Sequence, residues 1–321
     1  FSTEGNFADF GDMTDEKRGM SSCGNNTRGL NFAGRDDPAN LNIIDYITIG
    51  TLGNAADFGD LSAVTNSGSS VSNNTRALFA GGRPSSTSVN EIQYVTISTL
   101  GNAADFGDLL SILETQTRAS STTRALYAGG SDTSGNTYNV IQYSTFATTG
   151  NATDFGDLTV ARSQIQDAGS SNTTRGVFGS GKDPSATNVM DYVTIASTGN
   201  ATDFGDMLAA TNRQAGAGSS TRGLFGGGYA PSTQNVIQYV TIATTGNATD
   251  FGDLTQARNL VAAVSNSERA VFAGGLTPSR VDTMDFVTIA STGNATDYGD
   301  LRETTHSPHS ASNGHGGLVG G

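Results

Sequence analysis

The chain has 321 residues and a formal net charge of −13, and only 15% of its residues are charged. This acidity disfavours a nucleic-acid partner, because binding to phosphates requires a basic surface. The single cysteine, Cys23, excludes an internal disulfide, and no apolar run is long enough to cross a membrane as a helix. The 42 glycines, together with abundant Ser, Thr and Asn, favour short strands and tight turns over long helices.

One string close to Gly-Asn-Ala-Thr-Asp-Phe-Gly-Asp-Leu recurs along the whole chain. Its seven copies begin 47–49 residues apart, at Gly5, Gly53, Gly101, Gly150, Gly199, Gly246 and Gly293. A period this regular indicates one supersecondary unit used repeatedly, as in propellers and other arrays. A consensus residue that is present in every copy is therefore a poor candidate for a unique catalytic group.

In chain order, residues 1–12 resemble the end of a third strand followed by a fourth strand. Six complete units follow, at about 13–60, 61–108, 109–157, 158–206, 207–253 and 254–300. In the unit 158–206, short runs of strand-forming residues bounded by Gly, Pro, Asn and Asp predict four strands. The third run is apolar on both faces, which indicates a strand buried between two layers. Residues 301–321 resemble the first two strands of another unit.

These observations predict an all-β, seven-bladed propeller with four antiparallel strands per blade, forming a single domain over residues 1–321. The seventh blade is expected to combine residues 301–321 with residues 1–12. A blade shared by the N- and C-terminal strands would close the ring and remove exposed strand edges.

The units resemble kelch-type β-propeller blades. Gly-Gly pairs end the second strand at 81–82, 129–130, 227–228 and 274–275, and a Tyr, or Phe286 in one copy, follows in the third strand. Kelch blades carry Trp in the fourth strand, whereas this chain has no Trp and places another aromatic residue there. We expect that residue to fill the space between blades: Phe10, Phe58, Phe106, Phe155, Phe204, Phe251 and Tyr298.

Several repeated polar motifs have both a structural and a chemical interpretation. For Asp-Phe-Gly we expect a structural role, in which Asp57 accepts from backbone N–H groups, Gly59 adopts a positive φ and Asp60 starts a turn. Binding of Ca²⁺ by the repeated carboxylates is the alternative. A second repeated residue is an arginine, which His315 replaces in the seventh copy. We expect these arginines to pair with aspartates or, alternatively, to bind an anionic ligand: Arg28, Arg76, Arg124, Arg175, Arg222 and Arg269.

Two further motifs favour structural interpretations. Seven Asn-X-Thr sequons, such as those at Asn25 and Asn151, are expected to serve mainly as turn chemistry. His306, His309 and His315 lie close together in the sequence and could bind a metal. The favoured interpretation is that they are residues of a divergent closing blade without a metal-binding role. No cofactor or metal is therefore predicted, and no catalytic residue.

The loop between the second and third strands differs from unit to unit while the strands repeat. In an up-and-down blade these loops share one face with the connections between successive blades. A constant scaffold with unlike loops on one face is typical of a recognition surface, although free drift of surface loops explains the variation equally well. The candidate ligand-binding residues are Arg35, Asp36, Arg83, Asp132, Tyr138, Lys182, Tyr229 and Arg280.

The long string at 236–254, and the similar one at 189–207, resembles repeats in structural proteins of marine tailed phages that infect cyanobacteria. This resemblance implies a non-enzymatic tail-fibre or other virion appendage protein, located at the particle surface. The implied partners are other virion proteins or a host cell-surface glycan; nucleic-acid binding and membrane insertion are not expected, and homo-oligomerisation is left open. The alternatives are a cellular surface lectin or adhesin and, less favoured, a propeller glycan hydrolase or lyase.

Overall fold

The computed structural model describes residues 5, 6, 8–114, 116–164 and 169–305, and every regular element within them is a β-strand. The strands form six antiparallel sheets, which we call blades 1 to 6 in chain order. Blade 1 contains β1 (Ser21–Gly24), β2 (Arg28–Phe32), β3 (Arg35–Asp36), β4 (Ala39–Thr48) and β5 (Ala56–Thr65). Blade 2 contains β6 (Ser69–Ser72), β7 (Arg76–Ala80), β8 (Glu91–Thr96) and β9 (Ala104–Asp108).

The remaining four blades repeat the four-stranded plan. Blade 3 contains β10 (Thr117–Ser120), β11 (Arg124–Ala128), β12 (Val140–Thr145) and β13 (Thr153–Asp157). Blade 4 contains β14 (Gly169–Ser171), β15 (Arg175–Gly179), β16 (Thr187–Thr194) and β17 (Thr202–Thr211). Blade 5 contains β18 (Ala215–Gly218), β19 (Arg222–Gly226), β20 (Val236–Thr241) and β21 (Thr249–Asp253). Blade 6 contains β22 (Ala262–Ser265), β23 (Arg269–Ala273), β24 (Val281–Thr288) and β25 (Thr296–Thr305).

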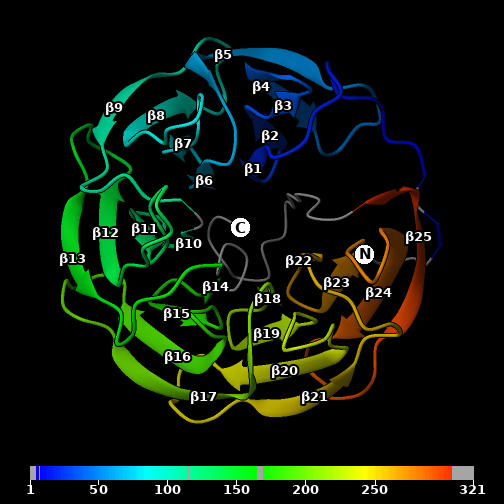
Figure 1. Ribbon diagram of the computed structural model, residues 1–321. Coiled ribbons are helices and arrows are strands. Elements are labelled where there is room, and N and C mark those ends of the chain that lie inside the picture. The colour runs from blue at the N-terminus through cyan, green and yellow to red at the C-terminus, as the bar shows by residue number, and fades with distance from the viewer. Residues whose placement is uncertain (1–4, 7, 115, 165–168, 306–321) are drawn as a thin grey trace.

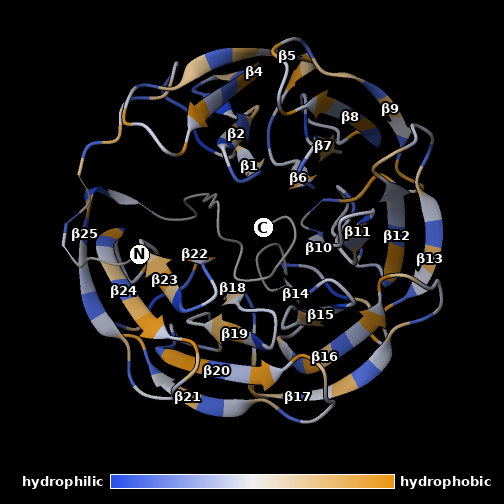
Figure 2. Ribbon diagram, turned by 180° about the vertical axis from the view of Figure 1, so that it is seen from behind, coloured by the Kyte–Doolittle hydropathy of each residue, from blue (hydrophilic) through white to orange (hydrophobic). Residues whose placement is uncertain are grey.

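The six sheets stand around a common centre, so the protein is a six-bladed β-propeller (Figure 1). Each first strand lies nearest the axis and each fourth strand forms the rim. Strand order within a blade follows chain order, except that the short β3 of blade 1 is an additional partner of β4. The third strands carry apolar residues in the middle of each blade, while the rim strands are banded with polar residues (Figure 2).

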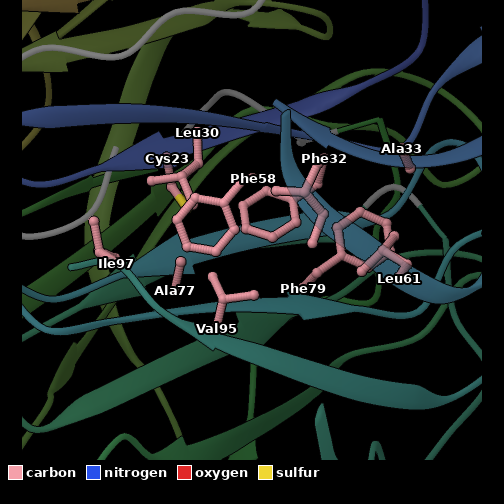
Figure 3. Close-up of a cluster of buried hydrophobic side chains, with 11 residues drawn as sticks. Cys23, Leu30, Phe32, Ala33, Phe58, Leu61, Ala77, Phe79, Val95 and Ile97 are labelled. Carbon is pink, nitrogen blue, oxygen red and sulfur yellow. The ribbon is translucent and has the colours of Figure 1, made fainter. Parts of the chain in front are cut away.

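The cores lie between blades. Phe58 of β5 packs with Ala77 and Phe79 of β7 and with Val95 of β8, so a rim residue of blade 1 is buried against blade 2 (Figure 3). The same packing recurs around the ring, and each of these rings is about 2% exposed: Phe58, Phe106, Phe155, Phe204 and Phe251. The expected aromatic packing between blades is thereby confirmed for these five, whereas Phe10 and Tyr298 are only half-buried.

The Asp-Phe-Gly motif forms a β-bulge in the rim strand. In blade 3, Ile141 pairs with Gly156 and Gln142 pairs with Asp154, so Phe155 is an extra residue without a partner in the ladder. The Asp154 carboxylate accepts a hydrogen bond from the Gly156 N–H at 3.0 Å, which stabilises the bulge. The expected structural role of this motif is confirmed, although it acts within a strand and not in a turn.

The glycine of this motif allows neighbouring blades to approach closely. Gly59 has φ +144°, and a Cβ there would lie 2.4 Å from the Gly101 carbonyl carbon of the next blade. The N–H of Gly101 donates to Phe58 O at 2.8 Å, and that of Ala103 donates to Asp60 O at 2.8 Å. Each copy of the repeated string therefore hydrogen-bonds, through its first residues, to the last residues of the preceding copy.

The first copy, residues 5–12, joins blade 6 to blade 1 through the same contacts. Gly5 N–H donates to Tyr298 O at 2.8 Å, and Gly53 N–H donates to Phe10 O at 2.7 Å. Arg302 forms an ion pair of 2.9 Å with Asp9. In Figure 1 this dark-blue segment follows the rim between β25 and the outer strands of blade 1.

The prediction of seven blades was wrong, because the described residues form six four-stranded sheets. The repeated string marks the rim and not a complete sheet, so seven strings do not require seven blades. Residues 5–12 supply a seventh string and contain no strand among their described members. Residues 301–305 of the predicted closing blade belong to β25, the rim strand of blade 6, and residues 306–321 lie outside the described residues.

Candidate functional site

The variable loops lie where the chain enters each blade. Isolated β-bridges join the loop between second and third strands to the segment that precedes the first strand: Arg18 to Arg35, Glu114 to Ser131, Ser163 to Lys182, Asn212 to Tyr229, and Asn259 to Leu276. The prediction that these loops share one face with the blade-to-blade connections is confirmed. We call this surface, formed by the loops and the connecting segments, the loop face.

A cavity of about 690 Å³ opens on the loop face between blades 1 and 2. It brings together two of the predicted site residues, Arg35 of blade 1 and Arg83 of blade 2. The other lining residues are uncharged, and some are polar while others are apolar: Pro38, Ala39, Asn40, Val64, Asn66, Pro84, Ser85 and Ser86. This size lies within the range of small-molecule sites.

The two guanidinium groups are each partly neutralised. Arg35 Nε lies 2.7 Å from a carboxylate oxygen of Asp37, which also pairs with Arg18. Arg83 Nε lies 3.3 Å from a carboxylate oxygen of Glu114. Both arginine side chains are about two-fifths exposed, at 43% and 41%. Both side chains therefore remain partly accessible to a ligand.

Asn40 connects the two walls of the cavity. Its amide nitrogen donates to the backbone oxygens of Arg83 and Pro84, each at 2.9 Å, and its amide oxygen accepts from Asn66 at 2.7 Å. The backbone N–H of Arg83 in turn donates to Asn66 O at 2.8 Å. Asn40 is thus a positioning residue that fixes the Arg83 backbone relative to blade 1.

The other predicted site residues do not join this cavity. Asp36 is exposed in β3, and Lys182, Tyr229 and Arg280 lie in the loops of blades 4, 5 and 6. Tyr229 is 42% exposed and remains available for a contact. The loop face therefore presents separate single-blade groups in addition to the cavity between blades 1 and 2.

Asp132 and Tyr138 are engaged with each other in the loop of blade 3. The Asp132 carboxylate accepts hydrogen bonds from Asn136, from Ser134 N–H and from the Tyr138 hydroxyl. These bonds, led by that from the Asn136 side chain, lower the pKa of Asp132, and the same carboxylate raises the pKa of Tyr138. This pair stabilises the loop, so its two members are less available to a ligand than the sequence suggests.

Among the described residues, the repeated arginines contact aromatic rings and backbone oxygens instead of the expected aspartates. Arg28 stacks over the Tyr46 ring at 4.7 Å and donates to Ile97 O of the next blade at 2.7 Å. Arg76, Arg124, Arg175 and Arg222 repeat both contacts, and Arg269 stacks on Phe286. A guanidinium group suits this position because it combines a cation–π face with directional donors.

Three buried ion pairs were not expected from the sequence. Each joins the segment before the first strand to the third strand of the same blade: Lys17 with Asp45, Arg162 with Asp191, and Arg258 with Asp285. In blades 2, 3 and 5 a glutamine replaces the aspartate: Gln93, Gln142 and Gln238. Burial lowers the pKa of Arg162, and the Asp191 charge opposes this shift.

The sequence does contain a signal for these pairs. Wherever the third strand carries Asp before the aromatic residue, a Lys or Arg stands four residues after the start of the unit. Where it carries Gln, the same position holds Thr65, Leu113 or Thr211. The glutamine oxygen then accepts from a backbone N–H, as Gln142 does from Leu110 at 2.7 Å. Comparison of the repeats with one another would have revealed this pattern.

The sequon asparagines have structural partners. Asn25 Oδ1 accepts from Thr27 N–H at 2.9 Å, and its amide nitrogen donates to Asn74 O of the next blade at 3.0 Å. Asn151 Oδ1 accepts from Asp108 N–H at 3.1 Å. The expected turn chemistry is confirmed at Asn25, and at Asn151 the side chain joins the rims of two blades.

Two other sequence features concern metals and membranes. Within the described part of the chain, no group of three or more His, Cys, Asp or Glu side chains is placed to hold a metal ion. His306, His309 and His315 lie outside the described residues. None of the described segments forms a helix with the length and apolar character needed to cross a bilayer.

The fold places this chain in the structural class of β-propellers. The chain matches no protein-family model and no curated protein sequence.

Proposed function

We propose that this protein is a non-enzymatic structural component of a phage virion, an appendage or tail-fibre-type protein that displays its loop face for attachment to a host-surface glycan or for docking to another virion protein. The long repeated string supports the virion assignment, because it resembles repeats of cyanobacterial tailed-phage proteins. Kelch kinship is part of the same proposal, supported by the Gly-Gly pairs and the tyrosine of the third strand.

The cavity between blades 1 and 2 is the observation that most favours a binding role. Six blades share one scaffold, whereas Arg35 and Arg83 converge in only one gap between neighbouring loops. Loops held on a rigid scaffold are a common arrangement for recognition. The cavity opens on the loop face, which suits a ligand that is presented by another surface.

A non-catalytic role agrees with the contacts of the repeated carboxylates. Asp57, Asp105, Asp154 and Asp203 each accept from the N–H of the glycine two residues later. Glycoside hydrolysis typically needs two carboxylates that face each other across the scissile bond. The cavity is lined by cationic and uncharged residues, so its chemistry favours binding over hydrolysis.

Two measurements test this proposal. The purified protein is applied to an array of bacterial and algal surface glycans, and antibodies against it are used to probe purified phage particles. We expect glycan binding without release of shorter products, together with detection in particles. Detection only on cell surfaces would indicate a cellular lectin or adhesin, and progressive shortening of a bound glycan would indicate an enzyme; either result would contradict the proposal.

A further inference from the structure

We infer that the cavity between blades 1 and 2 is a subsite for the anionic group, a carboxylate or a sulfate, of an acidic saccharide. This inference rests on the proposed glycan-binding function and assigns the chemical class of ligand. It commits to Arg35 and Arg83 as the groups that contact the anion and to Asn40 as the residue that positions Arg83.

Positive charge is scarce in this chain. The chain has 17 Lys and Arg residues against 30 Asp and Glu residues. Six of the cations are the stacked arginines of the repeat, and three more are buried in ion pairs. Of the eight that remain, Arg18, Arg35 and Arg83 gather around this one cavity. Three of these eight cations therefore lie in or beside one gap in the loop face, whereas Lys182 and Arg280 lie in the loops of other blades.

The local ion pairs leave these cations able to bind. Three guanidinium groups are paired with two carboxylates, those of Asp37 and Glu114, while the exposed Asp36 adjoins Arg35 in β3. The two carboxylates approach the Nε atoms of the lining arginines, at 2.7 Å for Arg35 and 3.3 Å for Arg83, and both arginine side chains are about two-fifths exposed. The terminal edge of a guanidinium group is suited to bidentate contact with a carboxylate or sulfate.

The rest of the lining suits a sugar ring. Pro38, Pro84 and Val64, which is 44% exposed, offer apolar surface to the C–H groups of a pyranose. Ser85, Ser86 and Asn66 offer hydrogen-bonding groups for its hydroxyls. A small number of placed polar groups on an apolar surface is typical of small-ligand sites. The overall charge of −13 disfavours a nucleic-acid backbone as the source of the anion.

The test uses two kinds of probe. Glucuronate and inorganic sulfate are titrated by NMR to examine the cavity alone, and an alginate oligosaccharide, a sulfated dextran and neutral dextran are tested by calorimetry. We expect wild-type protein to bind the anionic probes with an affinity that falls as the salt concentration rises. We expect no detectable binding of neutral dextran. In Arg35→Gln/Arg83→Gln we expect a loss of about tenfold or more, because two charge-assisted contacts are removed.

Matched variants keep the test independent of folding. Arg302→Gln removes an exposed cation at the rim, paired with Asp9 at 2.9 Å, and should bind like wild type. Glu114→Gln removes a competing carboxylate and should tighten binding. A purely structural role of Arg83 predicts no such gain, so an unchanged affinity in Glu114→Gln would count against the inference.

The outcomes separate this inference from the proposed function. Oligosaccharide binding that persists in Arg35→Gln/Arg83→Gln would overturn the anionic subsite and leave glycan attachment standing. Glucuronate binding that is lost in this double variant, together with a blank glycan array, would support the subsite and overturn glycan attachment. Wild-type protein that binds none of the anionic probes would overturn the inference.

Discussion

At the scale of single residues, the same side chain performs the same task in successive blades. Tyr46 lies between the Arg28 guanidinium, 4.7 Å from the ring centroid, and the edge of Phe58, at 5.9 Å between centroids. The Arg28 cation lies over the negative face of the Tyr46 ring, and the Tyr46 and Phe58 rings form a T-shaped pair. Both geometries are favourable. This trio links the second, third and rim strands of a blade.

Replacement of Phe155 by alanine tests the packing between blades. The ring is 2% exposed and packs with Phe178 and Val193 of the next blade, so Phe155→Ala should destabilise the protein by about 3–5 kcal/mol. Urea unfolding measures the difference, and Val160→Ala, at a side chain 41% exposed, is the control with a loss below about 0.5 kcal/mol. Equal losses in the two variants would contradict this packing role.

Cys23 makes a specific contribution to the pH dependence of stability. Burial raises the pKa of its thiol from 9.0 to about 11, with a smaller opposing effect of hydrogen bonds to Ser70 and Ser72. Because the folded state favours the protonated thiol, this group contributes stability that is fully present below pH 9.0. The contribution is lost as pH rises through about 11. Between about pH 8 and about pH 10.5, wild type should therefore lose about 2 kcal/mol more than Cys23→Ala. Denaturant titrations at the two pH values provide the measurement, and parallel losses would refute it.

At the scale of the element, the third strand is anchored in two interchangeable ways. In blade 4 the buried Arg162 lies 2.7 Å from Asp191, whereas in blade 3 Leu113 and Gln142 occupy the corresponding positions. The Asp191 carboxylate is held by an ion pair, and the Gln142 oxygen instead accepts a hydrogen bond from a backbone N–H. The remaining strands of the two blades follow the same plan.

This alternation predicts the result of a double-mutant cycle. Arg162→Leu alone leaves the Asp191 charge buried without its partner and should cost about 3–5 kcal/mol. Addition of Asp191→Gln copies blade 3 and should restore stability to within about 1 kcal/mol of wild type. Urea unfolding of the two single variants and the double variant gives the coupling energy. A double variant as unstable as the sum of the single variants would show that the blades are not interchangeable here.

At the scale of the whole molecule, the repeated string forms a circle of contacts around the rim. Residues 5–12 complete this circle through the bonds of Gly5 to Tyr298 and of Gly53 to Phe10. Blade 6 and blade 1 are therefore joined by a segment from the start of the sequence. Joining the two ends of an array protects strand edges that would otherwise be open to association.

Deletion of residues 1–12 tests this connection. The deletion removes the backbone bonds to Tyr298 O and from Gly53 and Ala55, so the melting temperature should fall by about 5 °C or more. Arg302→Gln removes only the exposed ion pair with Asp9 and should change it by about 1 °C or less. Calorimetry and light scattering record melting and association. A monomeric deletion variant with unchanged melting would show that the segment does not join the blades.

Much of the fold is predictable because its signals are local. The alternation of strand formers with Gly, Asn and Pro predicts four strands per unit. Chain order predicts which loops share a face, and the β-bridges between loops and connecting segments confirm this shared face. The fully buried neighbours Ile141 and Gln142 confirm a third strand covered on both faces. For the candidate site, loop variability led to Arg35 and Arg83 but also to Asp132 and Tyr138, which bind each other.

Residue order along one repeat was sufficient for the strands and for the aromatic residues between blades, whereas the Asp-Phe-Gly motif was expected in a turn and forms a bulge within the rim strand. Assembly of the repeats decided the blade number, the carbonyl partners of the arginines and the meeting of Arg35 with Arg83. The physical reason is that strand formation depends on neighbours a few positions away, whereas these three features depend on contacts between residues about one repeat or more apart. Such contacts are set by how the sheets pack, and similar strings at the rim are compatible with more than one number of blades.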